Sequence, residues 1–381
     1  MYVSFNGGTS WRWFQLNLPV VPITDLAFHK REKELVVATQ GRAFWILDDL
    51  PLVYQLADAT LKEDMKLFQP KETYRTLRGG ARMAPVGEGQ NPPAGAVIYY
   101  SFREKPQGEV TLEFLDNSGK SIRKFSSAEP PKPVERAPGD EDEDEGPRPL
   151  PGANRVPAEA GLNRFVWDLR YPDATSFPGM ILWAANVRGP AVVPGTYQVR
   201  LTAGGKSETQ SFEIKKDPRL ATTPQDFARQ LEVALQIHGK LDQANQGVVQ
   251  IRDVRKQLED YAARVKDAKV GDSAKVLAKK LTAVEEALYQ TKNRANEDPL
   301  NFPIKLNNKL ANLLGGVESS DDAPTLQDTQ VYEDLASQVN TQLTTLKNLL
   351  ATDLANFNKL VHEQNVPAVI ITEPKAPSGA R

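Results

Sequence analysis

The sequence has no cysteine, and this absence excludes several kinds of chemistry at once. Without a thiol the chain can form no disulfide bond, no thiolate metal site and no cysteine nucleophile. The absence does not fix the compartment, because many periplasmic proteins also lack disulfides.

Histidine is scarce as well, with three residues in a chain of 381. His29, His238 and His362 lie in different segments, and none has a second histidine at the spacing of a metal-ligand pair. His238 falls on the apolar stripe of an expected helix, which favours a packing role. The sequence also lacks a glycine loop that would cradle a phosphate and a strand-to-helix nucleophile elbow. We therefore predict no metal site and no cofactor.

Neither one sign of charge nor a long apolar run dominates the chain. The 47 basic and 49 acidic residues give a net charge of -2, so no long-range field attracts nucleic acid or an anionic membrane. No apolar run approaches the roughly 20 residues that span a bilayer. Residues 1–3 enter an expected strand directly, without the basic stretch, apolar core and cleavage site of a signal peptide. The sequence thus predicts no nucleic-acid partner and no membrane span.

The first fifty residues predict hairpins. In the run Ser4-Phe5-Asn6-Gly7-Gly8-Thr9-Ser10-Trp11, the glycines supply the positive φ that a tight turn needs, and Asn6 closes the turn with Trp11 tucked beneath it. A second hairpin follows the strand Asp25-Leu26-Ala27-Phe28 and runs from Leu35 to Asp49. There Asp48 and Asp49 end a strand, where their carboxylates are expected to accept turn hydrogen bonds.

The spacing Ser-x-Asn-x-Gly-x-x-Trp resembles the Asp-box of bacterial neuraminidase-type repeats, with Asn6 where the family usually has Asp. The second hairpin resembles the final blade of secreted sortilin-like β-propeller proteins, whose bacterial members are often labelled glycosyl hydrolases. A propeller closes only when several four-stranded blades complete a ring, and this chain has material for little more than one. The resemblance therefore implies the C-terminal portion of a longer protein that is secreted or periplasmic. Residues 1–60 would be its terminal blade segment.

A boundary follows the blade segment. The stretch 51–59 is short and apolar, residues 66–77 could add a strand or a wrapping segment, and residues 78–95 are rich in Gly, Pro and Arg. We assign residues 61–95 to a linker.

Residues 96–216 predict an antiparallel β-sandwich. Two turns, Asp116-Asn117-Ser118-Gly119 and Ala203-Gly204-Gly205, have the chemistry of hairpin reversals. The run from Pro194 to Leu201 resembles a strand entry of fibronectin type III or immunoglobulin-like domains. Trp167, Tyr197 and Phe212 are expected in the core. The expected strands cover residues 96–102, 110–115, 121–125, 163–170, 196–203 and 206–214.

Two inserts interrupt the expected sandwich. Residues 129–157 are rich in proline and contain six consecutive acidic residues, 140–145, which predict a solvated disordered loop. A calcium site or a docking site for a basic partner are the alternatives. The second insert, 171–193, is apolar for a loop. We expect its Phe177 and Trp183 to fold back over the sandwich or to pack on a neighbouring module, with a binding surface as the alternative.

The last part of the chain, residues 217–366, predicts a helical bundle. Thr223-Pro224-Gln225-Asp226 offers a helix start with a variant capping box, and apolar residues then recur every three or four positions. The long first helix could be split at Gly239 or Gly247. Connections are expected at Gly271, at Pro299 and Pro303, and at Gly315-Gly316. Residues 367–381 predict a flexible tail. In fold class the chain is a multidomain β plus α protein.

Glycoside hydrolysis needs two carboxylates about 5 to 10 Å apart across a cleft. Asp25, Asp48 and Asp49 are the acidic residues of the blade that could supply them, but we assign no catalytic residue. The first hypothesis is a non-catalytic portion with structural or interaction roles, whose partners are the missing blades or another protein chain, and also a carbohydrate or a peptide. The second is part of a sialidase-like glycoside hydrolase whose active residues lie mainly upstream.

Overall fold

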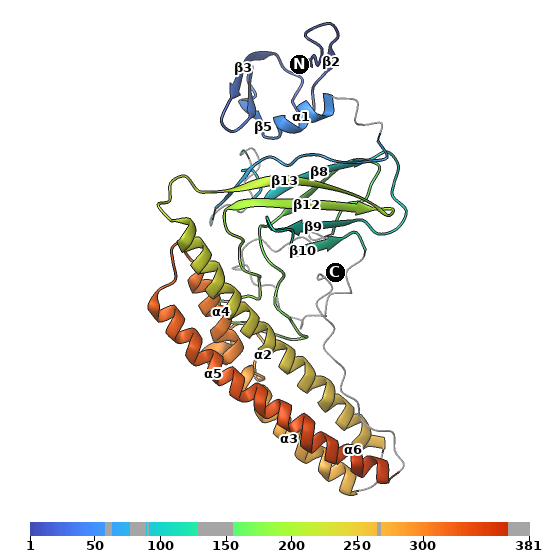
Figure 1. The fold of residues 1–381 in the computed structure, drawn as a ribbon, viewed down its shortest axis with the longest axis vertical. Helices are drawn as coiled ribbons and strands as arrows, with labels where there is room; N and C mark the ends of the chain where they lie inside the picture. Colours follow the sequence, from blue (N-terminus) through green and yellow to red (C-terminus); the bar gives the residue numbers. More distant parts are fainter. Residues whose placement is uncertain (58–62, 77–88, 90, 129–154, 265–267, 365–381) are drawn as a thin grey trace. The chain divides into compact units, whose positions relative to one another are not determined.

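The structure is a computed structural model, and it describes residues 1–57, 63–76, 89, 91–128, 155–264 and 268–364. It combines β-sheets with helices (Figure 1). The chain divides into two compact units. The sheet unit contains the described parts of Met1–Glu129, Pro149–Asp168 and Gly195–Asp217, and the helical unit contains those of Leu169–Pro194 and Pro218–Arg381.

The sheet unit begins with the predicted hairpin, in which β1 (Tyr2–Val3) pairs antiparallel with β2 (Arg12–Trp13). Gly7 and Gly8 take φ angles of 65° and 88°, which a side chain would strain. The Asn6 Oδ1 atom accepts a hydrogen bond from the Ser10 amide at 2.9 Å, so Asn6 forms the turn as expected. Trp11 lies next to Gly8 but stays 64% exposed, so the turn does not bury it.

A three-stranded antiparallel sheet follows, in the order β3-β4-β5. It comprises β3 (Ile23–His29), β4 (Glu34–Thr39) and β5 (Phe44–Leu47), as the second hairpin and its preceding strand predict. The apolar segment after it forms the helix α1 (Leu50–Ala57).

Two further sheets complete this unit. One has five strands in the order β10-β9-β12-β13-β7, and the other has three in the order β11-β8-β6. All six strands expected between residues 96 and 216 are present. Their bounds are β8 (Ala96–Phe102), β9 (Thr111–Leu115), β10 (Ser121–Ser126), β11 (Gly161–Trp167), β12 (Gly195–Ala203) and β13 (Lys206–Lys216).

Residues 61–95, which the composition predicts as a linker, contribute two strands to these sheets. β6 (Met65–Leu67) pairs antiparallel with β8, and β7 (Thr73–Arg75) pairs parallel with β13. The alternative of an added strand in 66–77 is therefore the correct one. Strands of three residues are too short to show a periodicity, which is why composition alone does not reveal them.

Aromatic residues join the two sheets. The ring of Trp167 on β11 stacks on Phe114 of β9 at 4.3 Å between centroids, and it meets Tyr197 and Phe212 edge-on. Trp167 is completely buried, and Tyr197 and Phe212 are 6% and 5% exposed. The predicted core residues are therefore confirmed.

The helical unit contains five α-helices among the described residues. The helices α2, α3 and α5 run alongside one another (Figure 1). α2 (Pro224–Arg264) begins at the predicted capping box, where the Thr223 amide donates to Asp226 and the Asp226 amide donates to the Thr223 hydroxyl. It continues unbroken through Gly239 and Gly247. The others are α3 (Ala268–Leu288), α4 (Leu306–Val317), α5 (Leu326–Asn348) and α6 (Leu354–Glu363), and a π-helix (Leu349–Asp353) joins the last two.

Two predicted helix connections are wrong. Gly271 lies inside α3, and Gly315-Gly316 lies inside α4. A glycine within a helix costs about 1 kcal/mol relative to alanine. The apolar residues that α3 and α4 bury around these positions outweigh that cost, so the helices extend through them.

The segment Leu169–Pro194 connects β11 to β12 but belongs to the helical unit. Ala174 and Phe177 are buried in the apolar core of that unit, where Phe177 meets Tyr289 edge-on at 4.9 Å. Phe177 therefore packs on a neighbouring module, which is one of the two outcomes that the sequence predicts, and does not fold back over the sandwich. Trp183 is 37% exposed, and its amide donates to Asn308 on α4.

Two predicted segments lie largely or wholly outside the described residues. Of the acidic insert 129–157, only 155–157 are described, and there the Val156 amide donates to the Ser126 carbonyl at 3.0 Å. The expected tail 367–381 is not among the described residues.

Candidate functional site

The three aspartates considered for catalysis are placed by the β3-β4-β5 sheet. Asp25 lies in the cross-strand row of Ala38 and Phe44, whereas Asp48 and Asp49 follow β5 beyond Leu47. Along β5, the three residue steps from Phe44 to Leu47 span about 10 Å, and the two strand spacings from β3 to β5 add about 10 Å in the perpendicular direction. Asp25 is therefore too far from Asp48 and Asp49 to form the paired carboxylates of a glycosidase.

Asp48 and Asp49 lie in a more polar environment than Asp25. The Tyr99 hydroxyl donates to Asp49 at 2.6 Å, and Lys71 donates to the backbone carbonyl of Asp48 at 3.0 Å. Burial, with further contributions from Glu34 and Asp49, raises the pKa of Asp48. The Asp49 carboxylate thus binds a tyrosine rather than accepting the turn hydrogen bond that the sequence predicts.

The three histidines lie on separate elements. His29 ends β3, and its Nδ1 atom accepts from the Glu32 amide at 3.1 Å, while the exposed His362 lies in the last turn of α6. His238 lies on α2, and its buried Nε2 atom has no partner in the parts of the chain that the structure describes. Burial lowers the pKa of His238, against the opposing effect of Asp242, Asp173 and Glu318. Across the described ranges, no group of three or more acidic or histidine side chains could hold a metal ion.

The β3-β4-β5 sheet carries apolar residues on both faces. Alternate residues of a strand point to opposite faces, so the strand register assigns each side chain to a face. The first face carries Leu26, Phe28, Leu35, Val37, Trp45 and Leu47. The second face carries Ala27, Val36, Ala38, Phe44 and Ile46 at its centre, with Asp25, His29 and Glu34 towards its ends. An antiparallel sheet with one solvated face alternates apolar and polar residues, and the centre of this sheet lacks that alternation in β4 and β5.

Large side chains on both of these faces are exposed. Leu26 and Phe28 on the first face are 50% and 47% exposed, and Phe44 and Ile46 on the second face are 75% and 57% exposed. Single exposed apolar residues are common, but a contiguous group on both sides of one sheet marks an interaction surface. We refer to these residues as the two-faced sheet surface.

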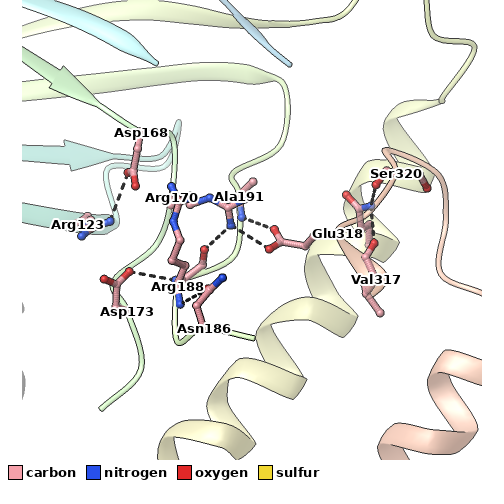
Figure 2. Close-up of polar contacts among 12 residues, drawn as sticks. Arg123, Asp168, Arg170, Asp173, Asn186, Arg188, Ala191, Val317, Glu318 and Ser320 are labelled. Atoms are coloured by element: carbon pink, nitrogen blue, oxygen red, sulfur yellow. Dashed lines mark hydrogen bonds and ion pairs between the residues drawn. The ribbon is translucent and has the colours of Figure 1, made fainter. Parts of the chain in front are cut away.

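Figure 2 shows a different polar cluster, which fixes the two ends of Leu169–Pro194 within the helical unit. Arg170 Nη1 donates to Glu318 Oε2 at 2.9 Å and to the Gly189 carbonyl at 2.7 Å. The other oxygen of Glu318 accepts from the Ala191 amide at 2.7 Å. We name this set the Arg170–Glu318 clamp.

The clamp is close-packed as well as polar. A Cβ at Gly189 would collide with the backbone carbonyls of Tyr171 and Pro172, so only glycine fits there. The Glu318 side chain is 11% exposed and uses both oxygens to hold the segment. The geometry therefore indicates a structural role.

Comparison with known proteins adds no identification. No family model matches the chain, and no curated protein matches it in sequence. What the structure defines is a mixed β and α protein with two compact units. Among its described residues, no helix is both long and apolar enough to cross a membrane.

Proposed function

We propose that this chain is a non-catalytic part of a secreted β-propeller protein, in which β3, β4 and β5 supply most of one blade. The observation that carries the proposal is the two-faced sheet surface. Blades of a propeller stack face to face around an axis, so a blade sheet is covered on both sides by its neighbours. A sheet with apolar residues on both faces is the pattern such packing requires.

The remaining parts then have structural or interaction roles. The strands β6 to β13 resemble an immunoglobulin or fibronectin III-like sandwich, and helices α2 to α6 resemble a bundle that follows it. The occupant that we assign to the two-faced sheet surface is a pair of neighbouring blade sheets, because these present apolar strand faces of matching spacing.

The coding sequence before Met1 offers one test. Further turns with the spacing Ser-x-Asn/Asp-x-Gly-x-x-Trp at a regular period, together with a signal peptide, would support the proposal. Unrelated sequence or a stop codon in frame would count against it.

A second test uses the surface itself. Expressed with blade sequences, the chain is expected to co-purify with them, and Phe44→Lys together with Ile46→Lys is expected to abolish the association. Val276→Lys is the matched control, since Val276 is also 57% exposed but lies on α3. Association that survives the Phe44 and Ile46 changes would exclude the second face as a blade contact.

A glycoside hydrolase that includes this chain is the second candidate function. The observation in its favour is Asp48, because a raised carboxyl pKa is what a general acid needs. We expect the purified chain to show no turnover of aryl glycosides, sialosides included, because the preorganised groups of an axial site need several blades. Saturable turnover that disappears in Asp48→Asn, Asp49→Asn or Asp25→Asn would reverse this conclusion.

A further inference from the structure

The helical unit contains an open pocket of about 470 Å³ that the proposed function does not use. Its walls come from α2, from α3 and from the residues just after α3. Six of its eight lining side chains carry charge: Arg252, Arg255, Lys256, Glu259, Glu285 and Arg294. Four of these are cationic and two are anionic, which leaves a surplus of two positive charges.

Two of the arginines are held rigidly. Glu285 is 2% exposed, and its two carboxylate oxygens accept from Arg252 Nε and Arg255 Nη1, each at 2.7 Å. The Arg252 guanidinium also lies 4.6 Å from the ring centroid of Phe177 and donates to the Pro178 carbonyl at 2.8 Å. These contacts fix both guanidinium groups before any ligand arrives, which lowers the entropic cost of binding.

The other two cationic side chains form no ion pair in the described part of the chain. The Arg294 guanidinium donates to the carbonyls of Thr291 and Asn293, while the Arg294 backbone amide donates to the Asp298 carboxylate. The Lys256 side chain is exposed. Both line the pocket and are exposed, so their charge faces solvent there. The Thr291 hydroxyl, also in the lining, adds a neutral donor.

We propose that this pocket binds a small ligand through a dianionic oxyanion group, a phosphate or a sulfate. Planar guanidinium groups donate paired hydrogen bonds that match the oxygens of such anions, and ammonium groups add charge. A dianion neutralises the surplus of two positive charges, whereas a single carboxylate leaves half of it. The proposal does not depend on the propeller assignment, because every residue in it belongs to the helical unit.

Isothermal titration calorimetry of the full chain tests the proposal with inorganic phosphate, inorganic sulfate and acetate at constant ionic strength. Saturable binding of phosphate and of sulfate is expected, with acetate binding at least about tenfold more weakly. Acidification from about pH 8 to about pH 5 removes one charge from phosphate but none from sulfate, so only phosphate is expected to bind more weakly at the lower pH. No saturable heat from either dianion, or acetate binding as tightly as phosphate, would overturn the proposal.

Variants locate the binding. Lys256→Gln with Arg294→Gln is expected to weaken phosphate binding at least about tenfold, because each change removes a charge-assisted contact. Lys256→Arg keeps the charge and is expected to keep the affinity. Lys309→Gln is the control, since Lys309 is also exposed but lies on α4 outside the pocket. Unchanged affinity in the double variant would place the anion elsewhere and refute the assignment.

The double variant is expected to fold, because neither side chain forms an ion pair within the described residues. Its unfolding midpoint without phosphate serves as the check. If the midpoint falls, the phosphate affinity of Lys256→Gln alone is compared with that of Lys256→Arg. A weaker affinity only in Lys256→Gln supports the site, and equal affinities refute it. General stabilisation by phosphate or sulfate through exclusion from the surface is not saturable and is the same in all variants.

Discussion

Trp167 lies where the five-stranded sheet and the β11-β8-β6 sheet meet, and the aromatic rings of Phe114, Tyr197 and Phe212 contact it. Replacing it with alanine removes this burial and leaves a cavity. We expect Trp167→Ala to lower the free energy of unfolding by about 3 to 5 kcal/mol. Chemical denaturation followed by circular dichroism measures the change.

Trp13 provides the matched control for that experiment, because it is 64% exposed on β2. Trp13→Ala is expected to change stability by less than about 0.5 kcal/mol. If the two variants were equally stable, the aromatic core would not be the element that joins the sheets.

His238 is expected to make the helical unit less stable in mild acid. Because burial lowers its pKa, the folded state binds this proton less readily than the unfolded state does. The stabilisation from the neutral imidazole is complete above the unfolded pKa of about 6.5 and is lost as the pH falls from there through the lower folded value. Unfolding followed between about pH 7.5 and about pH 5.5 should therefore show a stability that rises with pH.

The slope should shrink in His238→Gln and persist in His362→Gln, whose side chain is exposed in α6. Equal slopes in both variants would show that His238 is not the source of the pH dependence.

At the scale of elements, two glycines of α2 provide a comparison within one helix. A Cβ at Gly239 would meet nothing within 4 Å, whereas one at Gly247 would lie 2.9 Å from Leu343 Cδ2 on α5. We expect Gly239→Ala to stabilise the protein by about 0.5 to 1 kcal/mol through helix propensity. Gly247→Ala should gain less, because Leu343 must move.

Larger side chains sharpen that contrast. Gly247→Leu should destabilise the protein by about 1 to 3 kcal/mol through overpacking, and Gly239→Leu should not. Thermal unfolding of the four variants, alanine and leucine at each glycine, ranks their stabilities. Equal effects at both positions would mean that α2 and α5 are not closely packed at Gly247.

The elements that the sequence predicts well are those specified locally. The hairpin turns around Asn117 and Gly204, the six strands and the start of α2 at Thr223 all follow from turn residues, alternation and capping. The predicted connections at Gly271 and Gly315-Gly316 are wrong, because the packing around these glycines comes from residues distant in sequence.

The sites were harder to predict for the same reason. The separation of Asp25 from Asp48 follows from strand register, and the Arg170–Glu318 clamp joins residues 148 positions apart. Glu285 did give a local signal. It lies on a helix face with the buried residues Leu281, Val284 and Leu288, and a carboxylate in such a stripe needs a cationic partner.

For the whole molecule, the path of the chain matters most. Asp168, Pro194 and Asp217 are the points at which the described chain passes between the two units, so neither unit is a continuous stretch of sequence. A fragment of residues 218–364 contains the helices but lacks Phe177 and Ala174 from their core. We expect this fragment to stay helical but to unfold at a lower temperature than the helical unit of the full chain.

Joining residues 169–194 to that fragment through a flexible Gly/Ser linker should restore the unfolding midpoint. Joining the same segment with Phe177→Ala should restore less of it, since a buried aromatic contributes about 3 to 5 kcal/mol. Circular dichroism and binding of a hydrophobic dye follow the outcome. A fragment as stable without the segment as with it would show that the helices need no contribution from between β11 and β12.

The Arg170–Glu318 clamp also sets an order of events during synthesis. A ribosome adds about 5 to 20 residues per second, so the 148 positions between the two partners take about 7 to 30 seconds to emerge. In the part of that interval after β13 has emerged, Phe177 and Trp183 are already present, but their partners Tyr289 and Asn308 have not been synthesised. The strands up to β13 can therefore pair before the segment between β11 and β12 finds its contacts in the helical unit.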